Sequence, residues 1–275
     1  MRFHYNNYSL SSETINKIIK KNNSGIDHSQ RKNFTRIMLD GKMYFVKTIN
    51  VSIKRYSGES NTDNEIKPSI QFVNLINKYN KYSILFSNLH AILQTGYISY
   101  YIMDDIKNGD LSDMLPLFNQ EWIDHFLLQS LIGIYILNHK IKLFHNDIYY
   151  KDVIRNVMVH KNNKMQSDID IKVTLDNNNI CVPIKEYCIK IIDLGRSCKR
   201  PEFRTTEYHQ KYFPTLKYIS EPLLFTYFFF KTMNDDKFDI INKIINNIES
   251  SKTLKEFDEK FILEIIKKLK IKTNE

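Results

Sequence analysis

Apolar residues in the first part of the chain follow the pattern of β-strands. Four short runs are rich in β-branched and aromatic residues: 34–40, 43–50, 90–93 and 97–103. Between the first two runs, Asp40-Gly41 is a strong signal for a tight hairpin turn. We therefore expect a small antiparallel sheet in this part of the chain.

Helical spacing, with an apolar residue at every third or fourth position, predicts three helices: 11–23, 65–80 and 120–140. The first of these begins with Ser and Glu in the order of a helix cap. The third is apolar over most of its length, so we expect it to be buried. The rest of the chain is predicted to be mainly helical, with a short strand at 157–159 and two strands around an Asn-rich turn, 171–175 and 187–192.

A short polar segment separates the strand-rich part from the helical part. This segment, 104–111, contains Gly109 and has the composition of a linker. We therefore expect an α+β protein with two lobes, in which 1–103 form a β-rich first lobe and 112–275 a helical second lobe. A cleft between two such lobes is a common place for a ligand.

Composition narrows the class of protein. The 275 residues are 42% hydrophobic, which is enough for a sizeable core, and the net charge is +9. A positive charge attracts phosphorylated ligands and nucleic acid, but the lysines are scattered and a basic surface is the simpler interpretation. We do not expect nucleic acid to be a partner.

Cysteine usage and hydropathy indicate the compartment. The three cysteines, Cys181, Cys188 and Cys198, form no CxxC pair, which argues against zinc and favours reduced thiols in the cytoplasm. The first ten residues lack the apolar core of a secretory signal. The most apolar stretch, 222–230, is too short to span a membrane and is predicted to be a buried helix.

Two short motifs carry the chemistry. His145-Asn146-Asp147 follows the long apolar helix, and Asp193-Leu194-Gly195 follows an apolar strand. Each motif thus places a carboxylate at the end of an element that we expect to be buried. Two such carboxylates suit proton acceptance and metal binding, and phosphoryl transfer requires both.

The order of these motifs resembles the protein-kinase superfamily, in which H-R-D-x-x-x-x-N precedes D-F-G. The resemblance implies a small antiparallel-sheet lobe with one helix and a mainly helical lobe. It implies that Asp147 is the catalytic base, that Asn156 and Asp193 hold Mg²⁺, and that His145 braces the loop. ATP would donate its γ-phosphate to Ser or Thr hydroxyls of a protein substrate.

The strand-rich part carries a second set of matches to the same family. Val46-Lys47 resembles the family's V-A-I-K strand, so Lys47 would contact the phosphates of ATP. Glu65 opens the helix that follows and would pair with Lys47, with Glu59 as a weaker candidate.

The segment YYIMDDIKNGDL resembles the family's hinge between the two lobes. By this resemblance, Met103 would line the adenine pocket. Backbone groups from Asp104 to Ile106 would bind adenine, and Asp110 would contact the ribose.

The chain departs from the family pattern in three places. Asn156 lies nine positions after Asp147, which is four more than in the family. No Gly-rich loop precedes Lys47, and no A-P-E triplet follows Asp193. Thr205-Thr206 is interpreted as an ordinary loop rather than as a phosphorylation site.

Within the superfamily, the chain resembles divergent serine/threonine kinases of large cytoplasmic DNA viruses, of the poxvirus virion kinase type. Glu221, followed by an aromatic-rich stretch, is one shared feature. This resemblance implies a viral protein located in the host cytoplasm or in the virion.

Three other functions remain open. The missing glycines and the longer loop suit a pseudokinase that acts as a binding module. A small-molecule phosphotransferase would share the fold and would build its acceptor pocket from the region after 196. Nucleic-acid binding is suggested by net charge alone.

Overall fold

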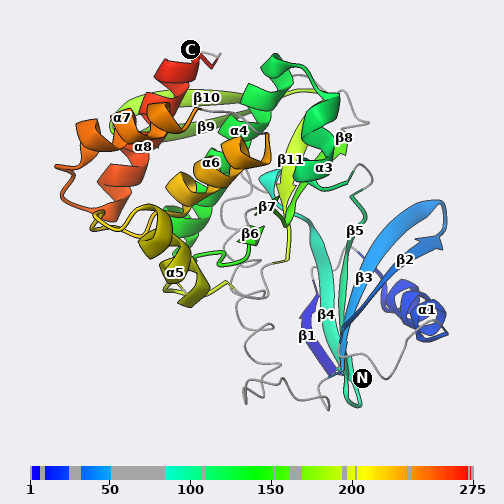
Figure 1. Ribbon diagram of the computed structural model, residues 1–275. Helices are drawn as coiled ribbons and strands as arrows, with labels where there is room; N and C mark the ends of the chain where they lie inside the picture. The colour runs from blue at the N-terminus through cyan, green and yellow to red at the C-terminus, as the bar shows by residue number, and fades with distance from the viewer. Residues whose placement is uncertain are drawn as a thin grey trace. The chain divides into compact units, whose positions relative to one another are not determined.

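The chain is an α+β protein that divides into two compact units. The computed structural model describes residues 2–6, 10–24, 32–50, 84–106, 109–150, 153–161, 169–193, 197–201, 203–233, 237–271 and 273. The first unit comprises Met1–Lys78 and Ser87–Ile106, and the second comprises Tyr79–Phe86 and Lys107–Glu275. Seven α-helices and only antiparallel sheets occur in the described ranges (Figure 1). The predicted α+β class is therefore confirmed.

The first unit contains a five-stranded antiparallel sheet with the strand order β1-β4-β5-β3-β2. Its strands are β1 (Arg2–Asn6), β2 (Lys32–Leu39), β3 (Lys42–Asn50), β4 (Leu89–Thr95) and β5 (Ile98–Asp104). All four predicted strands are present, whereas β1 was not predicted. Asp40 and Gly41 join β2 to β3 with φ values of 49° and 75°. This left-handed pair is the backbone of a two-residue hairpin turn, as the sequence predicted.

Helix α1 (Ser12–Asn23) covers one face of this sheet. Its cap is the predicted one, because the Ser11 side chain accepts a hydrogen bond from the Thr14 N–H at 3.1 Å. Buried residues of α1 pack in one cluster with Val46 of β3 and Ile102 of β5. Because side chains alternate along a strand, the neighbouring residue Lys47 projects from the opposite face of the sheet.

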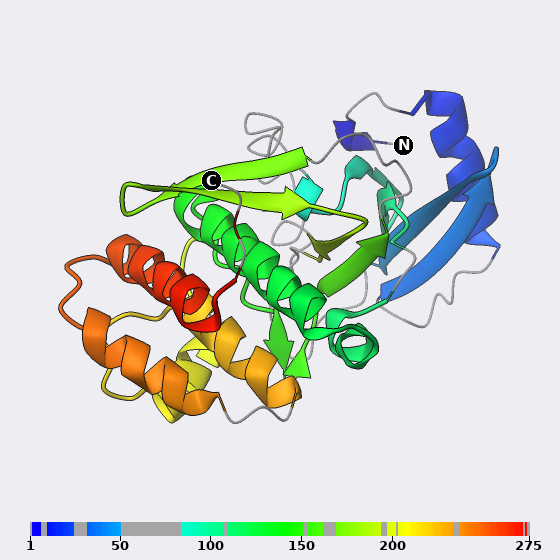
Figure 2. The same ribbon diagram turned by 90° about the horizontal axis from the view of Figure 1, so that it is seen from above.

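The second unit is mainly helical. Its helices are α3 (Leu111–Met114), α4 (Gln120–Tyr135), α5 (Phe203–Tyr212), α6 (Glu221–Thr232), α7 (Phe238–Ile248) and α8 (Leu254–Leu269), with a 3₁₀ turn at Leu115–Leu117. As predicted, α4 is almost entirely buried, and it continues into a π-helical turn, Ile136–Ile141. Figure 2 shows α4 in green, with α6, α7 and α8 along one side and a hairpin along the other.

Three two-stranded antiparallel pairs complete the second unit. They are β6 (Tyr149–Tyr150) with β7 (Val153–Ile154), β8 (Val157–Lys161) with β11 (Tyr187–Ile191), and β9 (Ile169–Leu175) with β10 (Asn178–Ile184). The predicted strands are present, but β10 was not predicted. It takes the place beside β9 because Asp176 and Asn177 adopt positive φ values and close a tight turn. The strand at 187–191 pairs instead with β8.

Two further predictions concern single segments. The apolar stretch 222–230 forms most of the buried helix α6, as predicted. No helix among the described residues has the length and apolar character needed to cross a membrane. The predicted helix at 65–80 lies outside the described residues.

Candidate active site

The loop that follows α4 brings Asp147 and Asn156 into direct contact. The side-chain Nδ2 of Asn156 donates to the backbone carbonyl of Asp147 at 2.7 Å and to its Oδ2 at 3.2 Å. Asp147 is 6% exposed, and Asn156 is buried as well. The strands β6 and β7 lie between the two residues in sequence and pair with each other. The longer spacing therefore does not separate Asn156 from Asp147.

Asp193 lies two residues after the end of β11. This strand pairs with β8, which begins directly after Asn156. In the β8–β11 pair, Val157 lies opposite Ile191, and the Ile192 N–H donates to the Asn156 carbonyl at 2.9 Å. Asn156 and Asp193 thus lie at the same end of this pair. Both have positive φ values, 59° and 51°, which non-glycine residues adopt mainly where the surroundings require it. The two remaining residues of the DLG motif lie outside the described residues.

His145 connects the loop to the residue before Asp193. The Asp147 N–H donates to Nδ1 of His145 at 3.3 Å, so the ring proton must lie on Nε2, which donates to the Ile192 carbonyl at 2.8 Å. The ring is completely buried, and burial lowers the pKa of His145. His145 is therefore neutral, with both ring nitrogens in hydrogen bonds.

Oxygen donors are the groups that could hold a metal here. Among the described residues, no three His, Cys, Asp or Glu side chains gather as a metal site. Asn156 uses its amide nitrogen on Asp147, so its Oδ1 and the Asp193 carboxylate are the candidate ligands. One carboxylate and one amide oxygen fit Mg²⁺, which binds few protein oxygens and completes its shell with water and phosphate.

Glu221, the first residue of α6, binds the backbone of the loop that carries Asp147. Its Oε2 accepts the His145 N–H at 2.9 Å, and its Oε1 accepts the Asn146 N–H at 2.8 Å. The side-chain amide nitrogen of Asn138 donates to Oε2 of Glu221 and to the Leu143 carbonyl, both at 2.9 Å. Burial raises the pKa of Glu221 to about 7, although these hydrogen bonds oppose the shift. Sequence reasoning noted Glu221 only as an acid before an aromatic-rich helix.

Asn146 joins the loop to the segment after Asp193. Its Nδ2 donates to Cys198 Sγ at 3.2 Å and to the Arg200 carbonyl at 3.3 Å, and its Oδ1 accepts from Thr205 Oγ1 at 3.1 Å. Phe144 and Cys198 also exchange two backbone hydrogen bonds of 2.8 and 3.0 Å. Thr205 is completely buried, and its hydroxyl is used in this contact.

A buried carboxylate of α8 supports the start of α6. Asp258 accepts from His139 Nε2 at 2.6 Å and from the hydroxyl of Ser220, the N-cap residue of α6. Burial raises the pKa of Asp258, while the contact with His139 opposes the shift. The position of Glu221 is therefore fixed by both α6 and α8.

Lys47 belongs to the first unit. It lies in β3, is only 5% exposed, and its Nζ is 5.8 Å from the centre of the Tyr101 ring. Lysine is among the residues least often buried, so this position is informative. Glu65, its predicted partner, lies outside the described residues.

The predicted adenine-binding segment is the end of β5. Met103 is half-buried and pairs with Phe45. The Asp104 carboxylate accepts from His90 at 2.8 Å and Lys42 at 3.0 Å; burial opposes its ionisation, but these contacts hold its pKa well below the usual range. The Asp104 N–H donates to the Asn88 carbonyl at 3.1 Å, so adenine would have to use other backbone groups of this segment.

Ile106 and Asp110 are the other two predicted contacts of the nucleotide. Ile106 is buried and is the last residue of the first unit. Asp110 belongs to the second unit and precedes α3, where its side chain makes no capping hydrogen bond. Burial, and next the charge of Asp113, raise the pKa of Asp110.

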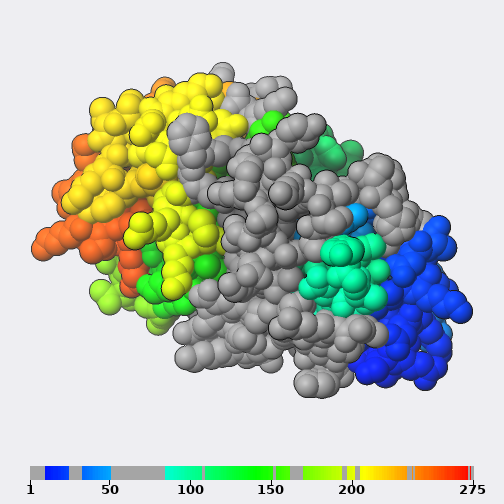
Figure 3. All heavy atoms as spheres, turned by 90° about the horizontal axis from the view of Figure 1, so that it is seen from below, coloured from blue at the N-terminus to red at the C-terminus, as the bar shows by residue number. Residues whose placement is uncertain are grey.

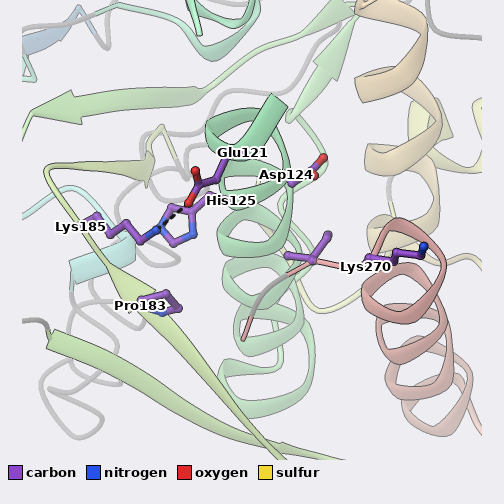
Figure 4. A pocket seen from close by; sticks show the side chains of 7 residues that line it. Glu121, Asp124, His125, Pro183, Lys185 and Lys270 are labelled. Carbon is purple, nitrogen blue, oxygen red and sulfur yellow. Dashed lines mark hydrogen bonds and ion pairs between the residues drawn. The ribbon is translucent and has the colours of Figure 1, made fainter. Parts of the chain in front are cut away.

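A separate pocket of about 350 Å³ lies in the second unit (Figure 4). Its lining residues are Glu121, Asp124, His125, Pro183, Lys185, Lys270 and Ile271. Glu121 and Lys185 form an ion pair of 3.2 Å, and burial lowers the pKa of His125 to about 4. None of the predicted site residues lines this pocket.

The sequence matches no protein-family model and no curated protein.

Proposed function

We propose that this chain is an ATP-dependent protein kinase that phosphorylates Ser or Thr hydroxyls. One observation carries the proposal. Asn156 is bonded to Asp147, and the residue before Asp193 is bonded to both Asn156 and His145. The members of two motifs that are far apart in sequence thus meet in one part of the second unit.

The finer fold assignment is part of the proposal. A small antiparallel sheet with one helix, and a second unit that is mainly helical, support a protein-kinase-like fold. The burial of Lys47 in β3 supports its assignment as the phosphate-binding lysine.

The reaction needs a proton acceptor beside the acceptor hydroxyl. The hydroxyl oxygen attacks the γ-phosphorus, the bond from that phosphorus to the β–γ bridging oxygen breaks, and ADP leaves with the bonding electrons. The hydroxyl proton passes to the Asp147 carboxylate. His145 is a poor candidate for this base, because both its ring nitrogens are in hydrogen bonds and the ring is buried.

The remaining residues hold and orient the reactants. Asn156 fixes the Asp147 carboxylate through Oδ2, and Glu221 fixes the backbone before it. Oδ1 of Asn156 and the Asp193 carboxylate would hold Mg²⁺, which neutralises phosphate charge when bound. Lys47 would contact the phosphate oxygens of ATP.

The test is transfer of radiolabelled phosphate from Mg-ATP to generic protein acceptors. We expect wild-type protein to transfer phosphate and Asp147→Asn to lose transfer while keeping its thermal stability. Asp239→Asn, the same change at an exposed position of α7, is the matched control and should retain activity. Undiminished turnover in Asp147→Asn would overturn the assignment.

A binding module of the same fold is the second candidate, favoured by the absence of a Gly-rich loop before Lys47. Such a loop lets backbone N–H groups approach phosphates closely. A thermal-shift titration with Mg-ATP separates the candidates, since a ligand that binds only the folded state raises its stability. A thermal shift without phosphate transfer would favour the module.

A further inference from the structure

Three basic residues lie in or beside the loop that carries Asp147. The Arg155 guanidinium is 43% exposed and lies 3.7 Å from Oδ2 of Asp147. Arg200 is held beside the same loop, because its carbonyl accepts from Asn146, the residue before Asp147. Lys199 lies between Arg200 and Cys198, whose backbone is bonded to Phe144.

Lys199 and Arg200 are exposed, and their side chains make no hydrogen bond or ion pair with the part of the chain that the structure describes. In α5 and α6, Lys211 and Lys231 lie over the Tyr212 ring at 4.8 and 5.5 Å. Within the described residues of 197–233, Glu207 is the only exposed carboxylate. The segment after Asp193, which includes yellow atoms of Figure 3, therefore presents an excess of positive charge.

An acceptor hydroxyl at Asp147 brings its own neighbours close to the loop and to the backbone of residues 198–200 beside it. Adjacent residues of an extended peptide are spaced by about 3.3 Å, so residues one to three positions from the acceptor lie within reach of side chains around the loop. Opposite charges on the two surfaces would speed encounter and select among peptides.

Building on the proposed kinase function, we propose that the acceptor is an acidic polypeptide segment. Asp or Glu residues beside its Ser or Thr bind Arg155, Lys199 and Arg200, and the hydroxyl then lies at Asp147.

Most aromatic rings beside the loop favour a peptide over a nucleic acid; Tyr150, which is 38% exposed and lies 5.6 Å from Arg155, is the exception. Proteins that bind single strands stack successive bases on aromatic rings that are open to the ligand. Here Tyr149 is fully buried against Phe228, with 5.0 Å between ring centres, and Tyr208 packs against both at 5.6 and 5.3 Å. These rings contribute to the core beside α6 rather than to a stacking surface.

The experiment compares three peptides that share a central Ser flanked by acidic, neutral or basic residues. With Mg-ATP, we expect the highest kcat/KM for the acidic peptide. The double variant Lys199→Glu/Arg200→Glu should lose about tenfold of that kcat/KM, because two exposed charge pairs become repulsive. It should leave the neutral peptide within about twofold, which shows that the variant is folded and active.

Lys243→Glu, at an exposed position of α7 in the same unit, is the matched charge reversal and should behave as wild type. Transfer to all three peptides without an acidic preference, or an unchanged preference in the double variant, overturns this inference alone. No transfer to any peptide overturns the proposed function together with it. A single-stranded oligonucleotide that binds wild type but not the double variant, without any acidic preference among the peptides, would assign the surface to nucleic acid instead.

Discussion

The side-chain amide of Asn156 donates to both the backbone carbonyl and the carboxylate of Asp147, although the two residues are nine positions apart. The β6–β7 pair lies between them and brings the chain back. The nine-residue spacing thus contains a short hairpin, and the two predicted site residues are in direct contact.

The proposed role of Asn156 can be tested by removing this contact. Asn156→Ala removes both hydrogen bonds and a predicted Mg²⁺ ligand, so we expect a 10- to 100-fold loss of kcat, to order of magnitude, and a higher Mg²⁺ requirement. Steady-state rates measured across a Mg²⁺ titration would show both effects.

The control for Asn156→Ala must be an asparagine whose backbone also has a positive φ value. Asn177→Ala replaces an exposed asparagine with a similar φ, 64° against 59°, so it carries the same conformational cost of about 1 kcal/mol without the contact. An unchanged Mg²⁺ requirement in Asn156→Ala would contradict its role as a ligand.

Glu221 predicts a pH dependence of stability. Its pKa is about 7 in the folded chain against an ordinary value of 4.5, so between these pH values the folded state binds more protons than the unfolded state. The contribution of Glu221 to stability is therefore complete below pH 4.5 and falls as pH rises to about 7, by on the order of 3 kcal/mol.

Urea unfolding of wild type and Glu221→Gln from pH 4.5 to 8 measures this contribution. The difference in unfolding free energy between the two proteins should change with pH in that window and be constant above it. A pH-independent difference would show that the carboxyl of Glu221 does not titrate as proposed.

Lys47 should be dispensable for folding. Lys47→Met keeps the length of the side chain and the apolar packing of its stem in β3, so the variant should remain folded. Phosphate transfer should fall by at least about 100-fold, because the charge that we propose to contact phosphate is lost. Lys20→Met, at an exposed position of α1, should change neither folding nor phosphate transfer; equal activity in both variants would remove Lys47 from the site.

Close packing of α4 on β11 gives a coupling that can be measured. A Cβ atom at Gly133 would lie 2.7 Å from Cδ1 of Ile191, which is buried. Alanine favours a helix by about 1 kcal/mol over glycine, but the clash opposes this gain. In an Ile191→Val background, which lacks that carbon, Gly133→Ala should be more favourable by about 1 kcal/mol. Denaturant unfolding of the four proteins gives the coupling, and a value near zero would contradict the packing.

Local signals made much of the fold predictable. The Asp40-Gly41 turn and the Ser11 cap each depend on a few adjacent residues, and both are present. The long apolar run of α4 needed no partner to be recognised. In contrast, β10 begins with exposed asparagines and ends in a continuously buried run. Its apolar residues therefore follow neither the alternation of a half-buried strand nor the spacing of a helix, and the sequence did not identify it.

The part of the site that sequence missed depends on distant contacts. Asp147, Asn156 and Asp193 were predicted from the order of short motifs. Glu221 binds the backbone of residues 75 and 76 positions earlier, and no local pattern encodes such a contact. The β6–β7 hairpin was equally hidden, because strands of two residues have no measurable period.

The paired backbone bonds between Phe144 and Cys198 close the intervening chain into a ring. Asp147 lies three residues from one end of that ring and Asp193 five residues from the other, so the closure limits how far the two segments can separate. An event that orders one end, such as occupation of Asn156 and Asp193 by a cation, would consequently lower the entropy cost of ordering the other. Affinities for cation and acceptor should then rise together, as a thermodynamic linkage requires.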